Sequence, residues 1–228
     1  MNFISIVLEQ ALISFPLVLG AYCSFSLMRL PDLSLEAAYV FGAVVSSRLL
    51  SCFGATSYGF FVAIAGSLCG GIVVGLLSGF LTHRAKLPHL LSSILVIGLF
   101  HGVTQYALGG SFFSVGQFAL GEGAVCGLRT DFFVLLILFI CLFLVGLLFF
   151  KSQLGMSLFI YGDNPQFFQN YNISTTFVLI IGLCIASALA GLSGYLDVQA
   201  AGFVDMNMGA GRALFCITSL ILGKVFVK

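Results

Sequence analysis

Long apolar runs dominate this sequence, and its polar residues gather in the short segments between them. Hydrophobic residues make up 60% of the 228 residues and charged residues only 7%, which leaves too little polar surface for a water-soluble globule of this length. A chain that crosses hydrocarbon is either helical or a closed barrel, and these runs do not alternate in polarity. The sequence therefore predicts an all-α, polytopic transmembrane helical bundle that forms one domain over residues 1–228.

Seven stretches have the apolar character expected of membrane segments. The first is too long for the core of a signal peptide and lacks a basic start and a cleavage site, so we expect it to remain as a helix. The second and seventh hold about 15 residues each and would cover about 22 Å of a core of about 30 Å, which makes them candidates for half-spanning segments. The stretches are Ile4 to Leu27, Glu36 to Leu50, Tyr58 to Leu81, Leu87 to Ala107, Phe132 to Phe150, Thr175 to Leu196 and Ala213 to Val227.

Basic residues indicate the side on which the connections lie. Arg84 and Lys86 share one tight connection, Lys151 opens another, and two predicted segments separate them. Both connections are therefore expected on the same side, and the positive-inside rule makes that side cytoplasmic. The orientation of the amino terminus depends on whether residues 31–50 cross fully.

Two polar segments interrupt the apolar pattern in a similar way. Asp32, Ser34 and Glu36 stand at the start of one predicted helix, and Asp205 and Asn207 precede the last one. Asp32 or Ser34 can cap the first helix, and Glu36 is favoured near its positive end. Transporters also use paired interrupted segments to direct helix ends at a substrate near the midplane. Helix capping and a substrate path bordered by these five residues both stay open.

The pattern offers no chemical site of the common kinds. The seven cysteines show no Cys-x-x-Cys spacing and lie mostly in apolar runs, so we expect small buried side chains. The three histidines show no metal-ligand spacing, and no Walker-type loop binds ATP. With a net charge of +1 and no basic stripe, nucleic-acid binding is not expected. We expect no catalytic residue, no metal and no cofactor in this chain.

Glycines at small-xxx-small spacing, such as Gly71 and Gly75, predict close helix packing in the bundle, with a subunit interface as the alternative.

The segment from Lys151 to Asn172 is a compact polar island, rich in aromatic and amide side chains, and is better suited to binding a soluble partner than to being a simple connector. A series of motifs begins within it: Leu154-Gly155, Gly162-Asp163-Asn164-Pro165, Ile173, Ser187 to Gly194, and Met208 to Gly211. In order and spacing these motifs resemble the ABC importer permeases of the branched-chain amino acid and ribose type. Pro31-Asp32-Leu33-Ser34 resembles the branch that is paired with a periplasmic lipoprotein for tryptophan, tyrosine or similar solutes.

This resemblance implies a permease subunit of an ATP-driven importer in a bacterial inner membrane, for an amino acid or similar small solute. It implies a permease homodimer, a cytoplasmic ABC ATPase that holds ATP and Mg, and a periplasmic solute-binding protein or lipoprotein. A short helix around Leu154 to Ile160 would seat in a cleft of the ATPase. The implied ATPase-coupling loop lies within residues 151–172 and contains Leu154, Gly155, Gly162, Asp163, Asn164 and Pro165.

The chain departs from the family pattern in that loop and at its end. Phe159-Ile160-Tyr161 stands where an Arg-Ala pair is common, and Phe168 and Asn172 stand where small residues are usual, so the ATPase contact is expected to be more aromatic and less charged. Residues 221–224 resemble the start of a span that further helices follow, which suggests a permease shortened at its C-terminus, or a fragment. The alternatives are an ion-coupled secondary transporter, which uses intramembrane carboxylates, and a truncated, non-transporting membrane remnant.

Overall fold

The computed structural model describes residues 3–53, 57–85, 87–110, 112–114, 124–125, 128–164, 166–170 and 174–226. Lys86, Pro165, Asn172 and Ile173, which enter the predictions above, lie outside the described residues. Within the described residues, five helices are long and apolar enough to cross a membrane, or six if one pair of helices bent by 66° counts as a single span. The all-α, polytopic bundle is confirmed.

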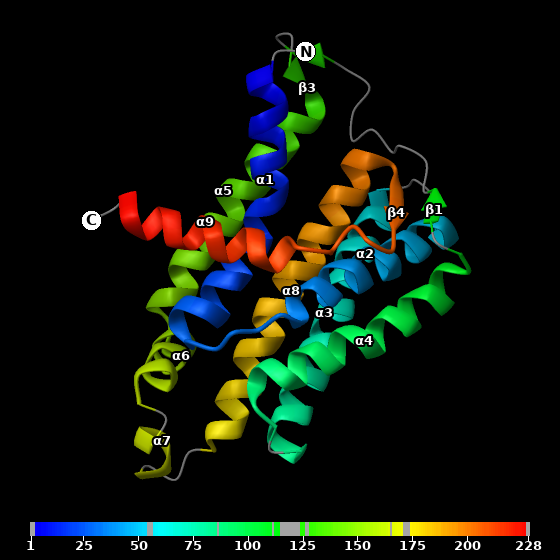
Figure 1. Ribbon diagram of the computed structural model, residues 1–228. Coiled ribbons are helices and arrows are strands. Elements are labelled where there is room, and N and C mark those ends of the chain that lie inside the picture. The colour runs from blue at the N-terminus through cyan, green and yellow to red at the C-terminus, as the bar shows by residue number, and fades with distance from the viewer. Residues whose placement is uncertain are drawn as a thin grey trace.

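Helices form nearly all of the described chain, and four short strands pair at its edge (Figure 1). Strand β1 pairs antiparallel with β4, and β2 with β3. The helices are α1 (Phe3–Ala21), the π-helix η1 (Tyr22–Leu27), α2 (Ser34–Phe53), α3 (Ser57–Ala85), α4 (His89–Leu108), α5 (Thr130–Lys151), α6 (Gln153–Asp163), α7 (Gln166–Asn170), α8 (Thr175–Ala201) and α9 (Arg212–Phe226). The strands are β1 (Phe112–Ser114), β2 (Ala124–Val125), β3 (Leu128–Arg129) and β4 (Phe203–Asp205).

The second predicted stretch is longer than its apolar core suggested. Helix α2 holds 20 residues and is about 30 Å long, so the half-spanning prediction is wrong for it. Its polar residues stay in the helix because their hydroxyls bond back to its own carbonyls: Ser46 and Ser47 both donate to the Ala43 carbonyl, and Ser51 donates to that of Arg48. Helix α9 has 15 residues and remains a short segment.

The two basic connections lie at the same end of the molecule, as the charge pattern predicts. The end of α3, the start of α8 and the α6–α7 region are together there, and the start of α1 lies at the opposite end with β3 (Figure 1). A hydrogen bond of 3.1 Å between the His83 imidazole and the Thr176 hydroxyl joins the end of α3 to the start of α8. The end of the bundle that the positive-inside rule predicts to be cytoplasmic therefore includes α6 and α7.

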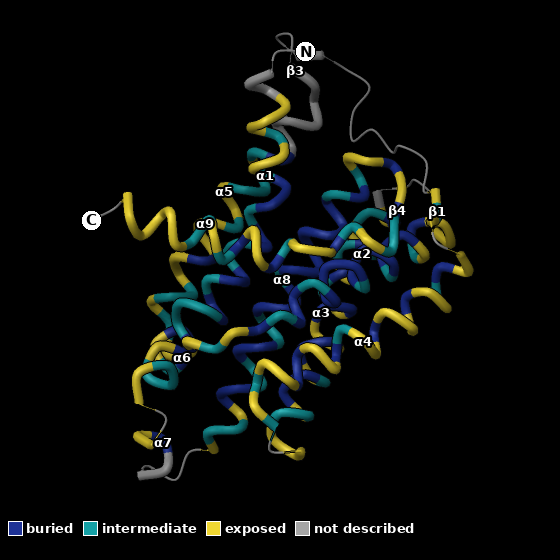
Figure 2. The backbone as a smooth tube through the Cα atoms, viewed as in Figure 1, coloured by how far each residue is buried: buried dark blue, intermediate teal, exposed yellow. Residues whose placement is uncertain are grey.

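The centre of the bundle is built on backbone contacts between α2, α3 and α8. The buried parts of these helices meet in the middle of the molecule (Figure 2). A side chain on Gly42 would collide with the backbone of Gly191, one on Gly191 with the Ser67 carbonyl, and one on Gly71 with the Ser187 carbonyl. The predicted packing of small residues within the bundle is confirmed for these helices.

The cysteines are less buried than the sequence suggested. Cys23 and Cys216 are buried, whereas Cys52, Cys69 and Cys141 lie on exposed surfaces of their helices. The prediction is wrong for these three because a lipid-facing surface is as apolar as the interior, so the apolar setting of a residue does not reveal its burial.

Replacing Gly191 by alanine should destabilise the bundle, because the new methyl group has no space between α8 and α3. Overpacking of this kind costs about 1–3 kcal/mol, which outweighs the gain of up to about 1 kcal/mol in helix propensity. The melting temperature of the purified protein in detergent should fall. Gly223→Ala is the matched control, since nothing lies within 4 Å of the site of its added methyl group. Equal melting temperatures for the two variants would contradict the packing argument.

Candidate functional site

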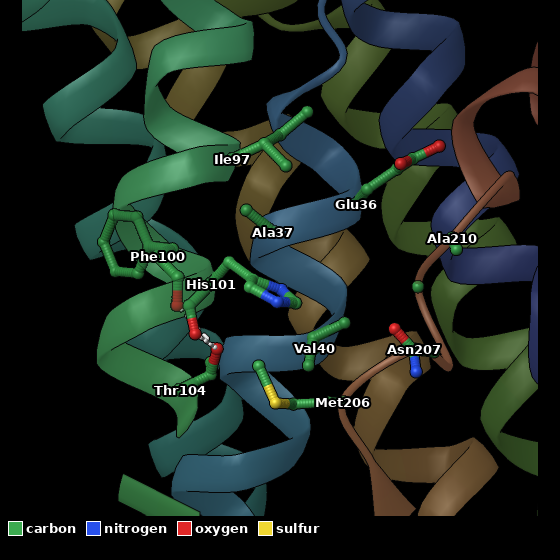
Figure 3. A pocket seen from close by; sticks show the side chains of 11 residues that line it. Glu36, Ala37, Val40, Ile97, Phe100, His101, Thr104, Met206, Asn207 and Ala210 are labelled. Atoms are coloured by element: carbon green, nitrogen blue, oxygen red, sulfur yellow. Dashed lines mark hydrogen bonds between the residues drawn. The ribbon is translucent and has the colours of Figure 1, made fainter. Parts of the chain in front are cut away.

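A pocket of about 180 Å³ lies where α2, α4 and the connection from β4 to α9 meet (Figure 3). We call it the α2/α4 pocket. Four of its residues are polar and the others form an apolar wall. The polar residues are Glu36, His101, Thr104 and Asn207, and the others are Ala37, Val40, Ile97, Phe100, Met206, Gly209 and Ala210.

Glu36 connects this pocket to the start of α9. It lies in the first turn of α2, as predicted, and its Oε1 accepts the backbone N–H of Ala213 at 3.3 Å. The first N–H groups of a helix have no partner within the helix, and the helix dipole makes that end positive. The carboxylate of Glu36 therefore stabilises the starts of two helices, its own and α9.

Asp32 and Asp205 make the same local hydrogen bond. Asp32 Oδ1 accepts the N–H of Ser34 at 2.9 Å, and Asp205 Oδ1 accepts the N–H of Asn207 at 3.3 Å. The capping role predicted for Asp32 is thus confirmed. The two polar segments are also similar in geometry, because in each the aspartate accepts the N–H of the residue two positions later.

The structure separates the five residues predicted to border a substrate path. Glu36 and Asn207 line the α2/α4 pocket, whereas Asp32, Ser34 and Asp205 do not. Asp32 and Ser34 are fully buried at the start of α2, and within the described part of the chain neither Asp32 Oδ2 nor the Ser34 hydroxyl has a hydrogen-bond partner. Asp205 is half-buried in β4, opposite Phe112 of β1.

An ion pair behind the pocket was not anticipated from the sequence. Arg212 Nη2 lies 2.8 Å from Asp197 Oδ2, which also accepts the Tyr39 hydroxyl at 2.7 Å. The guanidinium also lies over the Tyr39 ring, 5.1 Å from its centroid. These contacts join the end of α8, the second turn of α2 and the start of α9. The partners are 15 and 158 residues apart in sequence, so no local pattern could have paired them.

The short helix predicted around Leu154 to Ile160 is present as α6. Ser152 caps its start by accepting the Leu154 N–H at 3.3 Å, and at its end the Asn164 N–H bonds to the Ile160 carbonyl at 2.8 Å. A side chain on Gly155 would collide with the Phe149 carbonyl, so glycine permits the sharp bend between α5 and α6. Of the predicted loop residues, Leu154, Asp163 and Asn164 are exposed, Gly155 is buried and Gly162 is half-buried.

The outer face of α6 and α7 is apolar and aromatic. Leu154, Met156, Phe159 and Phe167 are between 40% and 57% exposed. This exposed surface lies at the end of the molecule that also holds the end of α3 and the start of α8 (Figure 2). Large exposed apolar patches outside lipid mark protein contacts. Within the described residues, no group of three or more His, Cys, Asp or Glu side chains could hold a metal ion.

The chain matches, over residues 3–226, a protein family described as the permease component of a branched-chain amino acid transport system. The chain belongs to this permease family. A tyrosine transport system permease protein of Clostridioides difficile is 33% identical over 225 residues, which cover 97% of this chain and 73% of that protein. An uncharacterized protein of Rickettsia prowazekii is 31% identical over 98% of this chain and 78% of its own length.

More distant relatives agree. An autoinducer 2 import system permease protein of Salmonella paratyphi B is 25% identical over 97% of this chain and 63% of its own length. No solved structure matches the chain significantly. The protein is therefore a multi-pass permease of a bacterial inner membrane and the transmembrane subunit of an ABC importer. This finding supports neither an ion-coupled secondary transporter nor a non-transporting remnant.

Asp197→Asn should lower the melting temperature of the protein, because it leaves the Arg212 guanidinium, only 26% exposed, without its negative partner. Loss of a charged hydrogen bond costs about 1.5–3 kcal/mol. The control is Asp163→Asn, which breaks the Arg29–Asp163 pair, whose side chains are 62% and 63% exposed. That change should cost at most about 1 kcal/mol. If the two variants have the same melting temperature, the contacts of Asp197 do not stabilise the position of α9.

Proposed function

We propose that this permease imports an amino acid with an apolar or aromatic side chain, and that the α2/α4 pocket borders its path. The observation that carries the proposal is the position of Glu36, a carboxylate that lines an otherwise largely apolar pocket where two helices begin. The relative from Clostridioides difficile, described as a tyrosine transport permease, supports the same substrate class.

The chemistry of the pocket suits a zwitterion. An α-ammonium group needs an anionic or oxygen partner, which Glu36 offers, and an α-carboxylate needs N–H donors, which the Asn207 amide and His101 offer. Val40, Phe100 and Met206 form an apolar wall for the side chain. Few polar groups set in an apolar surface are the usual composition of small-molecule sites.

A second permease copy would complete this site. Gly98 and Gly102 lie on α4 with open space beside them. Two polar residues of the same helix, His101 and Gln105, are exposed. Polar side chains on a membrane helix are costly in lipid and normally face a protein or a water-filled path. Small residues at this spacing also favour helix pairing. We therefore propose a homodimer in which α4 faces the partner.

The apolar face of α6 is proposed to dock on a cytoplasmic ABC ATPase, which binds ATP and Mg and hydrolyses the nucleotide. The permease itself then holds no cofactor and catalyses no reaction. A periplasmic solute-binding protein or lipoprotein would deliver the amino acid from the opposite side. The aromatic character of the α6 face agrees with a contact that rests on apolar burial rather than on charge.

Uptake of a radiolabelled aromatic amino acid into cells should fall about tenfold or more in Glu36→Gln and should also fall in Asn207→Ala, because each removes a polar partner from the pocket. Thr218→Ala is the control, since Thr218 is exposed on α9 and its hydroxyl donates to the local Phe215 carbonyl. Membrane abundance of each variant must be measured in parallel. Full uptake by Asn207→Ala and Glu36→Gln would exclude this pocket from the path.

Phe159→Asp should abolish co-purification of the ATPase with the permease in detergent, because a carboxylate would be buried in an apolar interface. The control is Phe203→Asp on β4. Phe203 is 46% exposed and Phe159 52%, but β4 lies toward the opposite end of the molecule (Figure 1). Capture of the ATPase by Phe159→Asp at the level of the unaltered chain would contradict the proposed docking face.

A further inference from the structure

The end of η1 lies directly against the end of α6. A side chain on Gly162 would collide with the carbonyl oxygen of Leu27, so the close approach of the two backbones depends on glycine. The next residue of α6, Asp163, pairs with Arg29 through an Oδ1 to Nη2 distance of 3.2 Å. Two consecutive residues of α6 therefore contact a segment more than 130 residues earlier in the sequence.

Met28 fixes this contact in the protein interior. It is only 2% exposed and packs in one cluster with Leu158 of α6 and with Leu179 and Leu183 of α8. A side chain on Gly182 would collide with the Met28 sulfur, so α8 leaves space for it. Apolar burial thus holds residues 27–29 to α6, whereas the exposed Arg29–Asp163 pair mainly sets their orientation.

The same segment has an unusual backbone. Its π-helical turn is continued by hydrogen bonds from the Met28 N–H to the Cys23 carbonyl at 3.1 Å and from the Leu30 N–H to the Ser24 carbonyl at 3.0 Å. Arg29 is, among the described residues, the one non-glycine with a positive φ, at 55°. π-Helical turns and left-handed residues other than glycine are frequent at functional sites and in switch regions.

The segment leads directly into the α2/α4 pocket. Asp32 ends it by capping α2, and Glu36 follows one turn later, where it lines the pocket and contacts the start of α9. Because Asp32 caps α2 one turn before Glu36, a displacement of residues 27–29 that is carried through Asp32 also moves the Glu36 carboxylate.

We propose that residues 27–29 transmit the movement of α6 to the start of α2, and so change the position of Glu36 in the pocket. The proposal deepens the proposed function and rests on it, since the movement would come from the ATPase. It assigns Gly162, Met28 and Arg29 as positioning residues for transport. None of them lines the α2/α4 pocket.

Gly162→Ala should reduce the amount of amino acid transported per ATP hydrolysed, because the methyl group forces η1 away from α6. The full importer, with its ATPase and binding protein, is reconstituted in liposomes, and uptake and phosphate release are measured together. We expect transport per ATP to fall at least threefold, because uptake falls more than phosphate release does. A merely structural defect would lower both rates equally. The matched control is Gly223→Ala, and an unchanged ratio in Gly162→Ala would overturn the proposal.

A second set of variants avoids any folding defect. Arg29→Asp alters only an exposed side chain, and it should lower transport per ATP about two- to threefold, with restoration by the double variant Arg29→Asp, Asp163→Arg. No effect of the single variant, or no restoration in the double, would count against the role of Arg29.

If the unaltered chain fails to bind an ATPase, the proposed function fails separately. Deuterium exchange of the backbone amides, measured on the permease alone, then tests the contact between residues 27–29 and α6. Residues 30–36 should exchange faster in Gly162→Ala than in Gly223→Ala, and equal exchange rates would overturn the proposed role of that contact.

Discussion

The contact of backbone with backbone among α2, α3 and α8 is the constraint on which the rest of this protein depends. In lipid, apolar side chains gain little by leaving their surroundings, so helices associate through close packing and polar contacts. Gly42, Gly71 and Gly191 bring the three helices near enough for that packing to be effective. Because α8 extends from the end of the molecule that holds α6 and α7 to the Asp197–Arg212 ion pair, the same unit supports both candidate functional regions (Figure 1).

The position of α9 illustrates how polar contacts complete what packing begins. This short helix is anchored at its start by two carboxylates, Glu36 of α2 and Asp197 of α8. Both act on groups that carry positive charge, the unpaired N–H groups of the helix end and the Arg212 guanidinium. Helix α9 therefore begins in the middle of the molecule, beside the pocket.

Local sequence predicted those parts of the candidate site whose physics is local. The Asp-x-Ser spacing at Asp32 corresponds to a cap, and the polar island after Lys151 corresponds to α6, whose start and end are set by Ser152 and Asn164. The predicted length of α2 was too short because its buried serine hydroxyls donate to carbonyls of the same helix. This bonding lowers the cost of placing a polar side chain in an apolar segment. The pairing of Asp197 with Arg212 and Tyr39 could not be predicted, since it depends on which helix ends meet.

The sequence by itself determined that the chain lies in a membrane, that it is helical and to which permease family it is similar, because composition, hydrophobic run length and motif order carry that information directly. Only the tertiary structure decided that Glu36 reaches α9, that Asp32 lies away from the pocket and that Gly162 meets Leu27. Those facts depend on how helices cross, and the crossings are set by the absence of side chains at a few glycines. A pattern along one chain segment shows where a glycine stands, but only the folded bundle shows what fills the space beside it.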